Sequence, residues 1–336
     1  ILDPGDAKIT PPAGLNSTGR RGALAAWLTD PKNPLTARVM VNRIWQYHFG
    51  AGIAATSGDF GRMGSRPTHP ELLDYLTSSF VENGWSLKKL HRQILLSNTY
   101  QQSSDYQPKA AEADPDNKLL WRYNRRRIEA EAIRDSMLAV SGLLNRQMGG
   151  PGVFPPVPAG TLSELSATAV AGGWKTEKDA AQSNRRSVYI FVRRNLPYPM
   201  LQEFDSASTF ESWHQRKNTV TPSQSLDLLN NDLVLDFARA FAGRVLTEDS
   251  GLTPEAQVDA AFRLAYGRQA TADEQKMAAS FLQRQAPIMA ARFAEVEKVK
   301  PPMPTKTPEG MEPARATAFV DLCQMLLASN EFLYVN

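Results

Sequence analysis

The sequence predicts a mainly α protein: an irregular multi-helix domain of about nine helices, with one or two short β-strands and long loops. Three observations support this fold class. Apolar residues recur at three- and four-residue steps through most long segments, which indicates amphipathic helices. Several of these segments begin with helix-capping sequences. Only one stretch has the β-branched and aromatic composition of a convincing strand.

The N-terminal residues predict a lead-in and a short helix. Residues 1–20 are rich in Pro, Gly and Thr, which is typical of an extended segment. Residues 21–29 follow as a helix, and we expect Leu24, Trp27 and Leu28 to face inward. We therefore place a single mainly helical domain at 21–336, with a possible subdomain split near 148–184.

Three further helices are predicted before the middle of the chain. Asn33-Pro34 begins one that ends near Phe49, because Asn caps a helix and Pro fits its first turn. Thr68-His69-Pro70-Glu71 has the pattern of a capping box, and Ser86 caps the helix after it. The short link between these last two helices predicts an antiparallel hairpin.

A charged helix is predicted at 124–142, and we expect it to organise the rest of the domain. Its apolar stripe consists of Ile128, Ala132, Met137, Val140 and Leu144. A neighbouring face carries Arg127, Glu131, Arg134 and Asp135. Because these charges are spaced for contact along a helix, we expect them to pair with one another while the helix lies wedged in the interior.

The second half begins with an irregular segment and ends with helices. Residues 148–184 show no clear period, which is typical of a functional or poorly ordered loop. Residues 187–192 predict a strand, whose partner could come from around Val153 or from the stretch after it. Thr221, Thr253 and Thr271 are the predicted caps of the later helices. Residues 300–313 form a Pro-rich loop, and the final helix is predicted at 313–329.

Composition excludes several classes of function. The net charge of +3 on 336 residues, with acids and bases interleaved, does not indicate a nucleic-acid surface. Cys323 is the one cysteine, so the chain has no CxxC motif for a metal or a haem. The four histidines have no metal-ligand spacing such as HxxxH, and no apolar run approaches the ~18 residues of a membrane span. We predict no metal, no cofactor in this chain and no membrane span.

Catalytic candidates are few. Glu131 and Asp135 are spaced for acid–base work, but the adjacent arginines favour a structural ion-pair network in which both stay ionised. His214 lies in a polar loop and has the fewest local explanations of the histidines. The histidines do not indicate a Ser-His-Asp site, because no Gly-x-Ser-x-Gly motif is present.

A binding site is the other possibility. Arginine suits bidentate contact with carboxylate or sulfate, and loop tryptophans can stack on sugars. The candidate ligand-binding residues are Arg127, Arg134, Arg186, Arg193, Trp174 and Trp213. The arginines could form an anion subsite, or they could bind acids within the fold. We expect Trp174 and Trp213 to be exposed, and Trp27, Trp45 and Trp121 to pack in the core.

Several stretches together resemble one known family over nearly the whole chain. They are AAWLTDP at 25–31, VNRIWQYHFG at 41–50, DFG at 59–61, PTHPELLD at 67–74, NRRR at the start of 124–135, RSVY at 186–189, NTVTP at 218–222 and SNEFL at 329–333. In this they resemble the planctomycete-specific PSD domain family, also called domain of unknown function 1553. The resemblance implies that the chain is the C-terminal module of a larger exported protein. It also implies a cytochrome-c-like module earlier in the same polypeptide, which would carry any haem c. It implies an extracytoplasmic location and brings no catalytic residues.

Three functions remain open from the sequence. The first is a module that docks onto other modules of the same polypeptide, such as a cytochrome-c-like domain, or that binds a ligand. The second is an enzyme for acidic or sulfated polysaccharide, with Glu131 or Asp135 as acid–base in a groove between the central helix and the 149–184 loop. The third is a cell-envelope scaffold, which predicts a broad exposed apolar patch.

Overall fold

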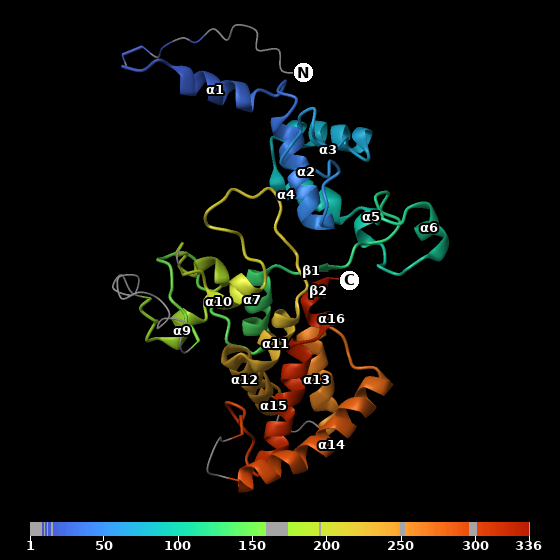
Figure 1. Cartoon of the computed structure of the whole chain (residues 1–336), viewed down its shortest axis with the longest axis vertical. Coiled ribbons are helices and arrows are strands. Elements are labelled where there is room, and N and C mark those ends of the chain that lie inside the picture. Colours follow the sequence, from blue (N-terminus) through green and yellow to red (C-terminus); the bar gives the residue numbers. More distant parts are fainter. Residues whose placement is uncertain are drawn as a thin grey trace. The chain divides into compact units, whose positions relative to one another are not determined.

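A computed structural model describes residues 9, 11, 13, 14, 16–158, 174–194, 196–248, 253–295 and 301–335 (Figure 1). The mainly α prediction is confirmed: the described residues form 15 helices and one two-stranded sheet. The chain divides into two compact units, one ending at Arg126 and one spanning Arg127–Val335. The division predicted near 148–184 falls inside the second unit, and residues 159–173 lie outside the described part.

The first unit is a set of helices around α2. Its helices are α1 (Arg20–Thr29), α2 (Thr36–Phe49), α3 (Pro70–Glu82), α4 (Leu87–Leu95), α5 (Asn98–Gln101) and α6 (Pro108–Ala113). The buried side chains of α2, α3 and α4 form the core, which includes Val41, Leu76 and Ile94. Asn33 holds the start of α2, since its Oδ1 accepts the N–H groups of Leu35 and Thr36.

The inward face predicted for α1 is wrong. Leu24, Trp27 and Leu28 are 56%, 44% and 41% exposed, and no residue of this helix is buried. Apolar spacing along ten residues marks one face of a helix, but burial of that face requires another element to pack on it. Trp45 is buried, as expected, whereas Trp121 is half-buried.

The second unit contains the remaining helices. They are α7 (Ala130–Val140), α9 (Ala180–Ser183), α10 (Pro199–Glu203), α11 (Pro222–Asn230), α12 (Asp232–Glu248), α13 (Pro254–Tyr266), α14 (Ala272–Ala294), α15 (Pro313–Leu327) and α16 (Asn330–Leu333), with a 3-10 turn η1 (Ser187–Tyr189). The core of this unit is centred on α15, which packs against both α12 and α14 (Figure 1). Phe319, Val320 and Cys323 of α15 are buried there with Phe241 of α12. Among the described helices, none is long and apolar enough to cross a membrane.

The central helix is shorter than predicted. Helix α7 begins at Ala130, and the preceding Arg126–Arg127 forms strand β1, paired with β2 (Tyr334–Val335). The Ile128 N–H also donates to the Leu333 carbonyl at 2.8 Å. Helical spacing of charges therefore does not mean helix here, because backbone pairing with a distant segment competes for the same residues.

The strand predicted at 187–192 is also wrong. Ser187–Tyr189 is a 3-10 turn, and Ile190 makes only an isolated parallel bridge with Val153. Two backbone hydrogen bonds hold that bridge: Val153 N–H to Tyr189 O at 2.8 Å and Phe191 N–H to Val153 O at 2.9 Å. The predicted partner around Val153 is thus confirmed, although the pairing is too short for a strand.

Helix capping follows the sequence at most sites. Thr221 and Thr271 form complete capping boxes with Gln224 and Glu274, and Thr253 accepts the Ala256 N–H. The box predicted at Thr68 is absent, because His69 is the N-cap of α3 and makes no side-chain cap. The Thr68 hydroxyl donates instead to the Ile53 carbonyl.

Candidate functional site

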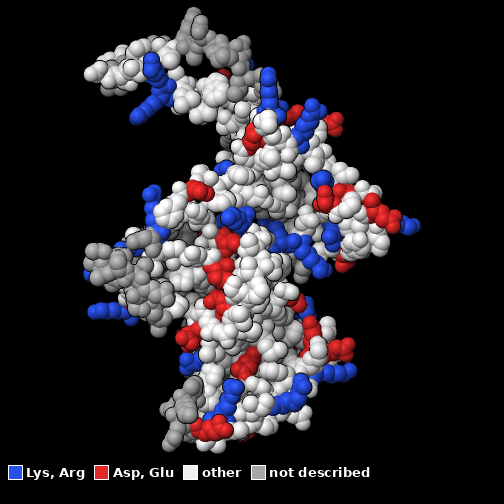
Figure 2. Space-filling model, in the orientation of Figure 1, with Lys and Arg blue, Asp and Glu red and all other residues white. Residues whose placement is uncertain are grey.

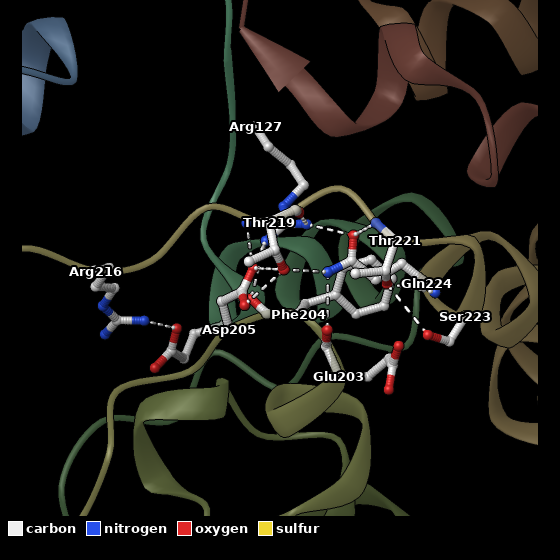
Figure 3. Close-up of polar contacts among 10 residues, drawn as sticks. Arg127, Glu203, Phe204, Asp205, Arg216, Thr219, Thr221, Ser223 and Gln224 are labelled. Carbon is white, nitrogen blue, oxygen red and sulfur yellow. Dashed lines mark hydrogen bonds and ion pairs between the residues drawn. The ribbon is translucent and has the colours of Figure 1, made fainter.

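The candidate site is built on Arg127, whose side chain is only 4% exposed. Its guanidinium donates to the carbonyl oxygens of Thr219 (2.6 Å) and Phe204 (3.3 Å) and to Gln224 Oε1 (2.7 Å). It also forms an ion pair with Asp205 Oδ2 at 2.6 Å (Figure 3). Arg127 therefore joins both ends of the loop that connects α10 to α11.

Three loop residues complete the network around this cation. Asp205 accepts hydrogen bonds from the Thr219 N–H (2.8 Å) and the Thr219 hydroxyl (2.9 Å). Gln224 Nε2 donates to the Glu203 carbonyl at 3.0 Å while the same side chain caps α11 (Figure 3). We call the group of Arg127, Asp205, Thr219 and Gln224 the Arg127 clasp.

The clasp keeps Asp205 ionised. Burial raises the pKa of Asp205, but the Thr219 amide, the Arg127 guanidinium and the Thr219 hydroxyl together lower it below its ordinary value. Asp205 also adopts a left-handed backbone with φ of 61°, which an aspartate tolerates better than most residues. The carboxylate is thus a neutralised structural anion that holds the start of the loop.

The loop that the clasp holds forms an open pocket of about 300 Å³. Its lining consists of Arg194, Pro197, Gln202, residues 205–210, Trp213, Arg216 and Lys217. We call it the 205–217 pocket. Phe210 is 72% and Trp213 38% exposed, and Lys217 Nζ lies 5.0 Å from the centroid of the Trp213 ring. The exposure expected for Trp213 is confirmed.

Glu131 contributes to this site indirectly. Its Oε2 accepts from Arg216 Nη1 at 2.6 Å, and Glu129 lies 3.6 Å from the same guanidinium. Arg216 lines the 205–217 pocket, so these two acids tie one wall of the pocket to the start of α7. Glu131 thus orients a pocket residue through an ion pair.

Arg134 and Asp135 serve a different part of the unit. Arg134 is 1% exposed and donates to the carbonyls of Ser183 (2.7 Å) and Arg185 (3.0 Å). Asp135 accepts the Ser187 N–H at 2.7 Å, and Arg186, which is half exposed, lies 3.6 Å away. Together they hold the 183–187 segment against α7.

The expected pairing among Arg127, Glu131, Arg134 and Asp135 is therefore wrong. Each of the four side chains meets a partner from a distant segment, because Arg127 lies outside α7 and Arg134 turns into the core. Glu131 and Asp135 instead bind two different arginines.

The exposure expected for Trp174 is wrong. The side chain is 6% exposed, its Nε1 donates to the Pro155 carbonyl at 2.7 Å, and its ring stacks on Tyr198. An apolar ring next to a long loop can still fill the core beneath that loop. Arg193 is half-buried and forms an isolated bridge with Leu196, and His214 is exposed beside Trp213 in the pocket loop.

The pocket residues were largely absent from the sequence candidates. The candidates that the sequence predicts do not include Asp205, Phe210, Arg216 or Lys217. The available signal was an aromatic and basic composition at 210–217 between a Ser-rich stretch and the capping box at Thr221. Among the described residues, no group of three or more His, Cys, Asp and Glu side chains could hold a metal ion.

Comparison with known proteins gives one match. The family model PSD1, described as a protein of unknown function (DUF1553), matches residues 20–282. No curated protein and no solved structure matches the chain. The match covers α1 and extends into α14, so it includes the Arg127 clasp and the 205–217 pocket.

Proposed function

The chain belongs to the DUF1553 family of proteins of unknown function, and we propose that it is a binding module whose 205–217 pocket takes an acidic or sulfated sugar. One observation supports this most directly. An exposed aromatic ring, Trp213, lies beside a cation, Lys217, in a pocket whose one described acid is already neutralised by Arg127.

The charge balance of the pocket favours an anion. Asp205 is paired with Arg127, and Arg216 is paired with Glu131. Within the described part of the chain, Arg194 and Lys217 have no carboxylate partner. Figure 2 shows both basic and acidic patches on the face that it draws, and the lining of the pocket holds three basic side chains, Arg194, Arg216 and Lys217, with one acid, Asp205.

The other lining groups suit a sugar. Phe210 and Trp213 offer apolar faces for the ring, and Ser206, Ser208 and Thr209 offer hydroxyls for hydrogen bonds. A volume of about 300 Å³ is at the lower end of the range for small-molecule sites, which suits one residue of a longer chain. An acidic or sulfated polysaccharide is therefore the ligand class that we propose.

Binding is better supported than turnover. A general acid needs a pKa near the working pH, whereas the pKa of Asp205 is lowered and Glu131 is held in an ion pair. Hydrolysis by Glu131 or Asp135 stays the alternative, but each carboxylate is engaged with an arginine. The extracytoplasmic location and a cytochrome-c-like neighbouring module stay proposals that come from the family resemblance.

Docking is a second candidate, favoured by the exposed face of α1. Trp27 and Leu28 of α1 and Val39 and Met40 of α2 line an apolar groove of about 340 Å³. Exposed apolar surface of this kind marks an interaction site in many proteins. Another module of the same polypeptide, or an assembly in the cell envelope, could cover it.

The proposal is tested by calorimetric titration with three oligosaccharides of equal length: one sulfated, one carboxylated and one neutral. We expect the two charged ligands to bind and the neutral one not to bind. Lys217→Ala and Trp213→Ala should each raise Kd by about tenfold or more, because each removes a contact of about 1.5 kcal/mol.

The matched control is Lys276→Ala. Lys276 is an exposed lysine of α14 that pairs with Asp273 at 3.6 Å, so its removal should leave Kd unchanged. The proposal is contradicted if none of the three ligands binds. It is also contradicted if Lys276→Ala weakens binding as much as Lys217→Ala, because binding would then depend on overall charge.

A further inference from the structure

Two histidines meet at the C-terminal end of α2, far from the 205–217 pocket in the sequence. His48 Nε2 of α2 lies 2.8 Å from His91 Nδ1 of α4, and the ring centroids are 5.0 Å apart. The two rings therefore meet head to head through these nitrogens. Both side chains are half-buried.

The hydrogen bond between the two rings needs one proton, on either His48 Nε2 or His91 Nδ1. It cannot form when both of these nitrogens carry a proton. An imidazole nitrogen donates only when protonated and accepts only when not, so one histidine must present a bare nitrogen to the other. If both rings become imidazolium, both nitrogens carry hydrogens, and the hydrogen bond is replaced by repulsion between like charges.

The surroundings do not offset that second charge. The groups that face His48 are His91 from α4, Tyr100 from α5, the Tyr123 hydroxyl on its backbone carbonyl (2.8 Å), and Arg126. Neither imidazole has a carboxylate partner among the described residues. The C-terminal end of α2 favours a cation, but burial, His91 and Arg126 together lower the pKa of His48 below its ordinary value.

We propose that the hydrogen bond between His48 and His91 is a pH-sensitive latch, which holds α4 and α5 against the end of α2 at neutral pH and releases them in acid. Tyr100 links α5 to the same place, since its ring packs edge-on against both His48 and Phe49. Opening would separate these rings and expose the end of α2.

The direction of the pH effect follows from the lowered pKa. The unfolded or opened state binds a proton on His48 below about pH 6.5, whereas the latched state resists it. The stabilisation by the latch is therefore present above about pH 6.5 and is lost as the pH falls toward the lowered value. For one proton taken up on opening, the opening constant rises by up to about tenfold per pH unit in this window.

Hydrogen exchange of the whole chain between pH 7.5 and pH 5 tests the latch, after correction for intrinsic rates. We expect the amides of α4 and α5 to open more in acid than those of α12, which serves as an internal reference. His48→Gln and His91→Gln should abolish this pH dependence, because glutamine hydrogen-bonds without titrating in this range. His69→Gln is the matched control and should keep it, since His69 lies at the start of α3 and its ring nitrogen hydrogen-bonds to the neighbouring Thr68 hydroxyl.

Nitrogen-15 chemical shifts of the histidine rings give a second readout that needs no variant. The latch predicts coupled titration, in which His48 and His91 shift in common steps. The proposal is overturned if His48 and His91 titrate independently. It is equally overturned if α4 opens no more than α12 in acid, or if His48→Gln keeps the full effect.

Discussion

Replacing Arg127 with methionine removes the cation of the Arg127 clasp and keeps a side chain of similar length. The change leaves the Asp205 carboxylate, whose side chain is 14% exposed, without its ion pair. It also removes the donor to two loop carbonyls and one of the two donors to Gln224 Oε1, which keeps the Thr221 N–H. Removing one partner of a buried pair destabilises a protein by about 3–5 kcal/mol, and we expect a loss in that range.

The assay must report on the second unit alone, because a chain of two compact units need not unfold in one step. Hydrogen exchange of the amides at 219–230 measures local opening there, and circular dichroism with urea measures overall unfolding. Arg284→Met is the matched control. Arg284 is an exposed arginine of α14 whose Nε donates to the Ser280 carbonyl one turn earlier, so its loss should change stability by less than about 0.5 kcal/mol.

A second substitution separates charge from packing. Asp205→Asn in the Arg127→Met background removes the unpaired buried charge, and it should recover about 1–3 kcal/mol of the loss. Because the pKa of Asp205 is lowered in the folded state, its contribution is present above about pH 4 and is lost as the pH falls further. Arg127→Met should weaken that acid sensitivity, because only the Thr219 amide and hydroxyl would still lower the pKa of Asp205. The reasoning is refuted if Arg127→Met costs no more than Arg284→Met, or if Asp205→Asn deepens the loss.

Three further changes test other parts of the fold. Arg134→Met should cost about 2–4 kcal/mol and raise hydrogen exchange at 183–187, because two buried carbonyls lose their donor; no change at 183–187 would contradict this. Asp227→Asn should raise Tm near pH 7 and not near pH 3, since burial and Glu203 raise the pKa of Asp227 and penalise its ionised form; an equal gain at both pH values would be inconsistent. Gly243→Ala should lower Tm by an amount equivalent to about 1–3 kcal/mol, because its Cβ would lie 2.7 Å from Thr305 Oγ1; an unchanged Tm would exclude this close packing.

Much of the helical fold could be predicted because local chemistry determines where helices start. A threonine at the N-cap accepts a free N–H group of the first helical turn with its side-chain oxygen. Thr221, Thr253 and Thr271 each accept the N–H of the residue three positions later. The same logic failed where a distant segment decided the outcome. Arg126–Arg127 pairs with Tyr334–Val335, about two hundred residues away, and no local pattern announces that contact.

The candidate site was less predictable, since it depends on where arginines find acceptors. The sequence predicts Arg127 and Arg134 as ligand-binding candidates, but their role depends on loop carbonyls that only the folded chain brings to them. Trp174 and Trp213 look alike in the sequence, as single tryptophans in loops. One fills the core and the other lines the pocket, because burial is a tertiary property.

The most direct test of the proposed binding site is hydrogen exchange of the chain with and without a sulfated oligosaccharide at saturating concentration. Binding in the 205–217 pocket predicts slower exchange at 205–217, little change in α13 and α14, and no protection in Lys217→Ala at the same ligand concentration. Protection spread over the surface, or confined to another segment, would contradict the proposed site.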